Sequence, residues 1–274
     1  KAAENLHRQV WNVEDLAFLY PYDLYHPESG LATQLVASQR DRVIGFLFGF
    51  YGKGKQWFGP DIGFQNGKWV ESQLLAVDHD YRRTGLAKRL KFIQREQALR
   101  ENIDLIHWTV DPLQAGNAFL NFNQLGAVSA QFYPDYYVFR NDLNRITPSR
   151  IGMSWILNSD RVRACDAGDS IDWNFASLVQ DSGVEIISPP DLIPQSQCLD
   201  DPIWTPQGER ILIEIPVDWN EIQRRENMDM AIAWRITSDM VFKQILAGNG
   251  GNYALVGIVR DSNYDRVYLI ADKV

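Results

Sequence analysis

Apolar and polar residues alternate along the first half of the chain in a pattern that predicts strands separated by helices. Apolar runs typical of strands occur at residues 31–39, 42–52, 69–77 and 104–110. Apolar residues recur at helical spacing at residues 85–102 and 113–126. Arg40-Asp41 predicts a hairpin between the first two strands, and a Gly-rich loop is expected over residues 52–68. Alternation of this kind favours a sheet that is flanked by helices.

The pattern changes around residues 141–150, where we place a domain boundary, with domains at residues 1–146 and 147–274. The second half is expected to be α+β and carries no motif that we can connect to chemistry. Its predicted elements are strands at 152–159 and 210–216 and a helix that begins with an Asp218/Glu221 capping box and stops at Gly248. A long Pro- and Asp-rich passage runs to about residue 208, and the chain ends in a hairpin turning at Asn263. The fold class is therefore α/β (α+β), with a mixed sheet and a C-terminal α+β extension.

Composition excludes several classes of partner. A net charge of −8 disfavours nucleic-acid binding, because phosphate contacts need clustered cations. Cys165 and Cys198 form no disulfide framework, and the four His are scattered, so we expect no metal. No stretch has the length of a membrane span, and the first residues lack the apolar core of a signal peptide. We therefore expect a soluble, cytoplasmic protein with no membrane partner.

A basic turn follows the apolar run that ends at Val77 and comes directly before a predicted helix. This turn, within DHDYRRTGLAKRL (78–90), contains Arg82, Arg83 and Gly85. The first turn of a helix has unpaired N–H groups and a partial positive charge, so this arrangement is suited to binding a phosphate. The alternative is a solvated basic turn that only connects two elements.

The same turn resembles the pyrophosphate loop of the GNAT superfamily of acyl-CoA-dependent N-acyltransferases. Arg82, Gly85 and Ala87 match that family's Arg/Gln-x-x-Gly-x-Gly/Ala pattern, and the resemblance covers roughly residues 5–140. Residues 108–137, WTVDPLQAGNAFLNFNQLGAVSAQFYPDYY, together with 148–157, resemble a little-characterised, double-length GNAT branch. The resemblance implies a GNAT-like fold, acetyl-CoA, succinyl-CoA or another acyl-CoA as co-substrate, and a small-molecule amine as acceptor. Some members of that branch are thought to acylate amino acids in pathways involving N-acylamino acid racemases.

The resemblance also implies which residues bind the acyl-CoA. The pyrophosphate is expected on the backbone of Arg82, Arg83, Thr84, Gly85, Leu86 and Ala87. In the family, the preceding strand splays apart at a bulge, and its exposed N–H groups meet the acyl carbonyl; here that segment is Leu75, Ala76 and Val77. Asn117 and Asn123 are expected to bind the pantetheine amides or the substrate; the alternative is a helix cap or an exposed face.

Acyl transfer to an amine needs a base, because a free alkyl amine is mostly protonated near neutral pH. Glu71 has the spacing to the turn of the general-base Glu in some GNAT members. On a regular strand Glu71, Gln73 and Leu75 share one face. The alternative for Glu71 is a solvent-facing or edge-strand carboxylate, with waters or other groups serving as the base.

The departing thiolate needs a proton or a positive neighbour. The Tyr that supplies the proton in the family is replaced here by Phe122, which we expect at the cofactor site but which has no proton to donate. Tyr133 is the favoured substitute, ahead of Tyr136 and Tyr137; the alternative role for these tyrosines is aromatic packing. Asp111, which precedes Pro112, is interpreted as a turn former.

Three functions remain open at this stage. We favour an acyl-CoA-dependent N-acyltransferase that acts on a small amine. The main alternative is a catalytically inactive acyl-CoA-binding GNAT-like protein, because the usual Tyr is missing. A nucleotide-phosphate binder is disfavoured, since the turn lacks both the Walker Gly-Lys-Ser/Thr and the Rossmann glycine spacing.

Overall fold

The computed structural model describes residues 2–11, 32–57, 64–136, 145–189, 205–224 and 228–274 of the 274-residue chain. It contains two compact units. The first unit comprises the chain up to Lys55, Asn66–Trp108 and Trp155–Asp166; the second comprises Gln56–Gln65, Thr109–Ser154 and Ala167–Val274. The predicted domain division between residues 146 and 147 stays a prediction. Each compact unit is made of several separate chain segments, so the units do not test whether either half folds independently.

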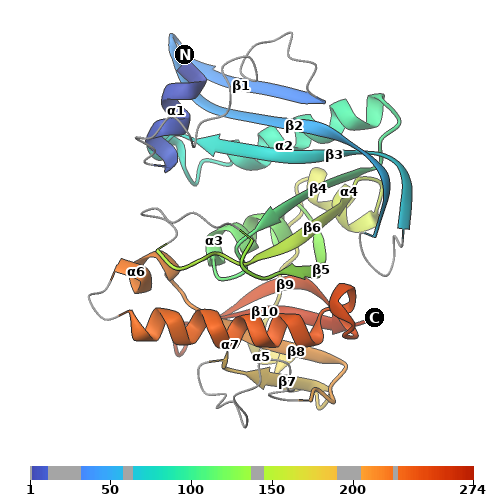
Figure 1. The fold of residues 1–274 in the computed structure, drawn as a ribbon, viewed down its shortest axis with the longest axis vertical. Helices are drawn as coiled ribbons and strands as arrows, with labels where there is room; N and C mark the ends of the chain where they lie inside the picture. Colours follow the sequence, from blue (N-terminus) through green and yellow to red (C-terminus); the bar gives the residue numbers. More distant parts are fainter. Residues whose placement is uncertain (1, 12–31, 58–63, 137–144, 190–204, 225–227) are drawn as a thin grey trace. The chain divides into compact units, whose positions relative to one another are not determined.

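Strands of the first unit follow the order β1-β2-β3-β4 (Figure 1). β1 (Thr33–Gln39) and β2 (Arg42–Trp57) form the predicted antiparallel hairpin. β3 (Phe64–Val77) follows, and β4 (Leu105–Val110) pairs with it in parallel. The strands predicted from the apolar runs are thus confirmed.

The Gly-rich loop predicted over residues 52–68 is wrong, because β2 continues to Trp57 and β3 begins at Phe64. Gly52 lies within β2 beneath the indole of Trp69. A Cβ on Gly52 would lie only 2.1 Å from that ring. Glycine in a strand often marks such a close approach, and here it makes room for a large side chain instead of forming a turn.

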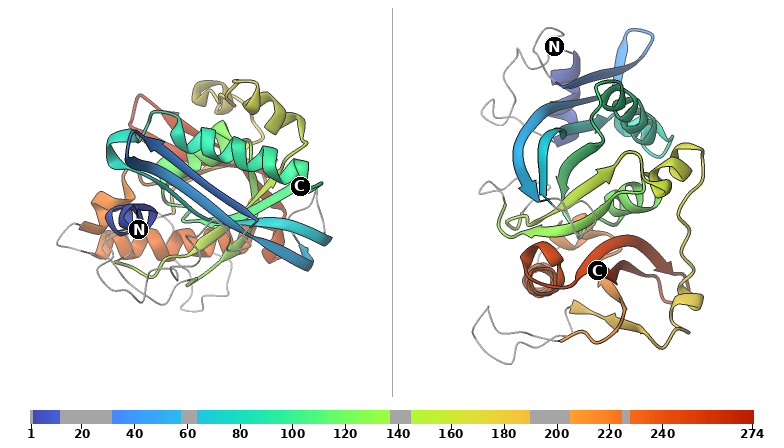
Figure 2. Two further views of the ribbon diagram at one scale, coloured as in Figure 1. Left: turned by 90° about the horizontal axis from the view of Figure 1, so that it is seen from above. Right: turned by 90° about the vertical axis from the view of Figure 1, so that its right-hand side faces the viewer.

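Two helices cover opposite faces of β2 in the first unit (Figure 2). α1 (Ala2–Trp11) places Leu6 against Phe46 and Phe48. α2 (Leu86–Arg100) approaches the other face so closely that a Cβ on Gly45 would lie 3.2 Å from Leu86. Residues 45 and 46 point to opposite faces because side chains alternate along a strand.

A second apolar centre of the first unit surrounds Trp155, which is fully buried. Its ring makes edge contacts with Phe92 at 5.5 Å and with Trp108 at 5.9 Å between centroids. α4 (Asp160–Asp166) follows, and Arg95 binds both the Leu157 carbonyl and the Asp166 carboxylate. These contacts place residues 155–166 in the same unit as α2.

The second unit has strands in the order β6-β5-β9-β10-β8-β7. Their bounds are β5 Val128–Tyr133, β6 Arg150–Ile156, β7 Val184–Ile187, β8 Arg210–Ile215, β9 Tyr253–Asp261 and β10 Arg266–Lys273. β7 and β8 pair in parallel and the other described pairs are antiparallel, so the sheet is mixed. The final hairpin predicted from the sequence is confirmed.

Helices of the second unit differ from the prediction at one place. Asp218 caps a helix as expected, because its Oδ1 accepts the Glu221 N–H at 2.9 Å. That helix, α6 (Trp219–Arg224), is short, and a separate helix, α7, covers Asp229–Ile245. The expectation of one long helix is therefore wrong, with residues 225–227 outside the described part. α3 (Ala115–Ala118) continues into a π-helical segment, η4 (Phe119–Gln124).

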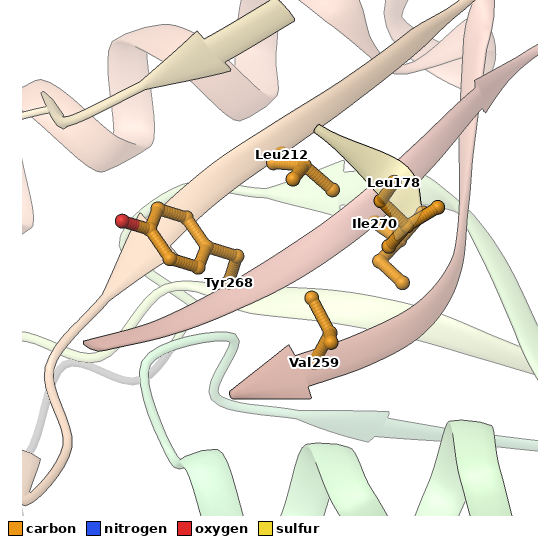
Figure 3. Packing of buried hydrophobic residues seen from close by; sticks show 5 residues of the cluster. All are labelled: Leu178, Leu212, Val259, Tyr268 and Ile270. Carbon is orange, nitrogen blue, oxygen red and sulfur yellow. The ribbon is translucent and has the colours of Figure 1, made fainter. Parts of the chain in front are cut away.

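Apolar side chains pack on both faces of the second unit's sheet. Figure 3 shows the cluster on one face, formed by Leu178, Leu212, Val259, Tyr268 and Ile270. Leu178 belongs to α5 (Phe175–Leu178). α7 lies on the opposite side of β9 and β10 from α5 (Figure 2), and its Phe242 packs 5.8 Å from Phe132 of β5.

Candidate functional site

Two residues in the turn between β3 and α2 have a positive φ, which few residues other than glycine adopt. Arg83 has a φ of 61° and Gly85 a φ of 84°, and α2 begins immediately at Leu86. Among the described residues, nothing lies within 4 Å of the position that a Cβ on Gly85 would take. The main chain at Gly85 is therefore open to the approach of another molecule.

The first turn of α2 is not neutralised by the protein's own side chains. No side chain caps the helix at Gly85, and its first turn contains no acidic residue. The first helical bond runs from the Arg89 N–H to the Gly85 carbonyl at 3.0 Å, so the N–H groups before Arg89 precede the helix ladder. Exposed Arg82 and Arg83 add positive charge. Such a helix start can hold a phosphate. Of the six residues expected there from the sequence, Arg82 already donates its N–H to the His79 carbonyl at 3.2 Å, and the other five follow it in the turn and the first helical residues.

The beginning of this turn is fixed to β2. The Asp78 N–H donates to the Ile44 carbonyl at 2.9 Å. The buried Asp78 carboxylate accepts the Asp80 N–H at 3.1 Å and the Arg42 guanidinium at 2.6 Å. Further along, the Thr84 hydroxyl donates to the Tyr81 carbonyl at 2.7 Å. These bonds hold the loop in position before any ligand arrives.

β3 changes the direction of its side chains just before the turn. The Ser72 hydroxyl contacts α2, since it donates to Gln94 Oε1 at 3.0 Å. Leu74 and Ala76 instead pack in the apolar cluster that contains Leu6 of α1. Residues two apart share one face in a regular strand, so the alternation shifts between Ser72 and Leu74, as it does at a β-bulge.

This shift changes which side chains of β3 lie on the same face as Glu71, the candidate general base. Because Ser72 faces α2, its neighbour Glu71 faces the other side, as Leu74 and Ala76 do. Leu75 lies between Leu74 and Ala76 and therefore faces α2. The expectation that Glu71 shares a face with Leu75 is wrong, because it assumed a regular strand.

β3 and β4 separate close to the same point. Their described pairs are Val70 with Ile106 and Glu71 with His107. No described pair joins Leu75, Ala76 or Val77 to β4. A parallel strand pair that stops early leaves backbone groups on its inner edges available to a ligand.

Glu71 is held by a neighbouring histidine. Its Oε2 and Oε1 lie 2.9 and 3.2 Å from His107 Nδ1. The His107 side chain is 4% exposed, whereas that of Glu71 is 32% exposed. The carboxylate is thus fixed from one side by a buried ring and remains accessible from the other. This is a suitable environment for a group that takes a proton from an amine.

Lys91 lies fully buried on α2 beside the irregular part of β3. Its Nζ donates to the Ser72 hydroxyl at 2.8 Å and sits 3.6 Å from the centre of the Trp108 ring. Burial lowers the pKa of the Lys91 ammonium well below its ordinary value, and the negative charge of Glu71 opposes this shift. The amine is enclosed, so it supports Ser72 and the strand instead of offering an exposed charge.

The site residues that the sequence predicts in the second unit differ in their exposure and hydrogen bonding. Asn117 is exposed, and the Phe122 ring is fully buried, so a ligand reaches that ring only if its neighbours move. The Asn123 amide binds both backbone groups of Ile258, at 3.0 and 3.1 Å, which accounts for its polar side chain without a ligand. The Tyr133 hydroxyl donates to Gln131 Oε1 at 2.7 Å. Tyr136 is exposed, and Tyr137 lies outside the described residues.

Asp111 forms the turn predicted for it, because its Oδ1 accepts the Leu113 N–H at 3.0 Å. Its other oxygen binds Arg235 of α7 at 2.6 Å, and both side chains are buried. Within the described part of the chain, no group of three or more His, Cys, Asp or Glu side chains is placed to hold a metal ion. In the same part, no helix combines the length and apolar character needed to cross a bilayer.

Sequence reasoning missed His107, Lys91 and Arg235. His107 occurs among apolar residues of a buried strand, and an ionisable residue in such a place is a weak signal. Lys91 is one of several basic residues in α2, so its sequence position does not distinguish it. Nothing in the local sequence around Arg235 indicates its pairing with Asp111, because the two are 124 residues apart.

Comparison with known proteins finds no matching protein-family model and no matching curated protein. Solved N-acetyltransferase structures show partial similarity. Chaetomium thermophilum Naa20, in complex with a bisubstrate analogue, is 16% identical with a TM-score of 0.43, over 64% of this chain and 87% of that one. Arabidopsis thaliana NAA60, in complex with acetyl-CoA, is 15% identical with a TM-score of 0.45, over 56% and 91%.

The ribosomal-protein-S18-alanine N-acetyltransferase from Escherichia coli is similar to the same degree. It is 16% identical with a TM-score of 0.40, over 57% of this chain and 88% of that one. Likenesses at these scores carry no argument about activity, so the function has to be inferred from the chain's own residues.

Proposed function

We propose that this protein binds an acyl-CoA at the turn between β3 and α2 and transfers its acyl group to the amine of a small molecule. The observation that carries the proposal is the open helix start at Gly85, with its positive φ, uncapped N–H groups and neighbouring arginines. In this assignment, the pyrophosphate accepts hydrogen bonds from the backbone of residues 82–87. Asn117 and Phe122 are assigned to the same cofactor by the sequence resemblance.

The reaction begins with proton removal from the amine. In our proposal Glu71 takes this proton, either directly or through a water, while His107 holds the carboxylate in position. The amine nitrogen then forms a bond to the thioester carbonyl carbon, and the carbonyl oxygen becomes negatively charged. Backbone N–H groups of Leu75, Ala76 and Val77, next to the shift in β3, are assigned to stabilise that oxygen. The nitrogen gives up its second proton to water as the bond between carbon and sulfur breaks and the amide forms.

The departing thiolate is a tolerable leaving group, because a free thiol has a pKa near ~8.5. We assign its proton to Tyr133, as the nearest tyrosine after the position of Phe122. The Tyr133 hydroxyl donates to Gln131, so it would have to exchange that bond for the sulfur. This same observation favours the second candidate function, an acyl-CoA-binding protein without turnover.

The donor is proposed to be acetyl-CoA or succinyl-CoA, and the acceptor a small amine, with amino acids as one class to test. Isothermal titration of the protein with coenzyme A, acetyl-CoA, succinyl-CoA, ATP and NAD tests the binding step. Release of free thiol in the presence of amines then tests turnover. Binding of ATP or NAD without coenzyme A would refute the proposal. Tight binding of acyl-CoA without turnover on any amine would support the inactive binding protein.

A further inference from the structure

The second unit contains a cavity that none of the residues assigned to acyl transfer lines. Its volume is about 480 Å³, which is in the range of small-molecule sites. One wall is a single face of α7, because its lining residues recur at helical spacing. These residues are Ile232, Arg235, Ile236, Asp239, Met240 and Lys243. The other wall comes from the end of β5 with the turn after it, and from Ile146 and Thr147.

Much of the cavity wall is apolar and partly open. Phe132 and Met240 form its buried part, while Ile232 and Ile236 are 42% and 46% exposed. Two neighbouring isoleucines at the edge of a cavity lose contact with water when an apolar molecule covers them. The wall therefore suits the hydrocarbon part of a ligand.

The polar part of the wall carries two acids and two bases. Asp135 and Asp239 both line the cavity, as do Arg235 and Lys243. The guanidinium of Arg235 is already engaged by the buried carboxylate of Asp111, at 2.6 Å. Asp111 does not itself line the cavity, but with it the cluster has three carboxylates and two cations when all five groups are ionised.

Asp239 is the less exposed of the two acids that line the cavity, and its pairing is incomplete. Its Oδ2 accepts the Ser149 hydroxyl at 2.6 Å. Its Oδ1 has no hydrogen-bond donor among the described residues, and the nearest cationic atom, Arg235 Nη1, lies at 3.7 Å. The side chain remains 20% exposed. A buried carboxylate with incomplete pairing gains most from an added hydrogen-bonding cation.

We infer that this cavity binds a small molecule with an apolar body and a protonated primary amine, whose ammonium group lies against Asp239. The apolar body covers Ile232 and Ile236, and the ammonium adds a third cation to the cluster that Asp111, Asp135, Asp239, Arg235 and Lys243 form. The inference concerns binding within the second unit alone and does not depend on acyl transfer.

The protonation of Asp239 supplies an independent sign of this site. Burial raises the pKa of its carboxyl to about 7; Arg235 and the Ser149 hydroxyl oppose the shift, and Asp111 and Asp135 add to it. Lys243 also faces the cavity. An ammonium needs the ionised carboxylate, so binding should strengthen as the pH rises from 6 to 8 and should release a proton at the lower end.

The test is isothermal titration of the full chain, without coenzyme A, using three probes with the same hydrocarbon body. Hexylamine should bind at pH 8 at least about tenfold more tightly than hexanol or hexanoate, a difference of about 1.4 kcal/mol. Equal affinity for hexylamine and hexanol would mean that the cavity recognises only the apolar body. Tighter binding of hexanoate than of hexylamine would mean that Arg235 binds the charged group of the ligand. Either result, or no binding of hexylamine, overturns the inference.

Matched variants locate the site. Asp239→Asn keeps the shape of the side chain and should reduce hexylamine affinity to that of hexanol, whereas Asp229→Asn, at the start of the same helix, should leave it unchanged. Ile236→Ala should weaken the binding of hexylamine, and Ile186→Ala, an equally exposed isoleucine outside the cavity, should not. These isoleucines are exposed, so their variants report on binding even if Asp239→Asn does not fold. Equal effects within each pair would refute the location.

Discussion

Replacement of Gly85 is the most direct test of the anion site, because the structure separates its effect on folding from its effect on binding. The residue has a φ of 84°, and a Cβ there would meet no described atom within 4 Å. An alanine is therefore strained but not in collision with the protein. The strain of a left-handed residue with a Cβ costs about 1 kcal/mol.

Gly168 provides a matched control for this strain. It has a φ of 107° and is likewise surrounded by open space. Gly168→Ala should therefore lose at least as much free energy of unfolding, about 1 kcal/mol or more, because its φ lies further from the left-handed region. Chemical denaturation of the two variants measures this term directly.

The two variants should differ in their affinity for coenzyme A. A Cβ on residue 85 keeps a phosphate away from the N–H groups of the helix start, and each lost charge-assisted bond costs roughly 1.5–3 kcal/mol. Gly85→Ala should thus bind coenzyme A about tenfold to a hundredfold more weakly, and Gly85→Glu should show no binding because it also adds a repelling charge. Gly168→Ala and Gly168→Glu should bind as the parent protein does. Unchanged affinity in a folded Gly85→Glu protein would refute the placement of the pyrophosphate.

Four further outcomes are expected. Glu71→Gln keeps the shape of the side chain but removes its basicity, so turnover should fall by roughly 10² or more at neutral pH, and less at high pH; a fall under about threefold makes the residue a surface carboxylate. Tyr133→Phe should lower turnover at least about tenfold with acceptor binding unchanged, and a rate near that of the parent would exclude this tyrosine as the acid. A fragment of residues 1–150 lacks the fully buried Trp155 and should be insoluble or unfolded, since loss of such a ring costs about 3–5 kcal/mol; a soluble, active fragment would contradict this. The pKa of Asp239 is about 7 in the folded protein against an ordinary 3.8. Protonation of Asp239 therefore contributes stability that is fully present below about pH 4 and is lost as the pH rises through 7. Asp239→Asn should remove up to about 4 kcal/mol of this pH dependence in denaturation curves, and an unchanged dependence would refute the shift.

Local patterns in the sequence were sufficient to predict most elements of the fold. β1, β2 and α2 follow from apolar spacing, and the start of α2 follows from Gly85, because each of these signals lies within a few residues. Gly52 was misread for the same reason: a glycine in a short window indicates a turn, and only the fold reveals the Trp69 ring above it. The shift in β3 was expected only from the family resemblance, since no local pattern marks it.

Residues that act through distant partners required the structure. Glu71 could be proposed from its spacing, but its orientation depends on His107, which comes beside it only when β3 and β4 pair. Asp111 shows both kinds of role in one side chain. One oxygen forms a turn with a residue two positions away, which the sequence predicted, and the other neutralises Arg235, 124 residues away. Because that second bond occupies the arginine, Asp239 is left as the acid with incomplete pairing in the cavity. The amine site inferred there thus exists only through a pairing that no local pattern encodes.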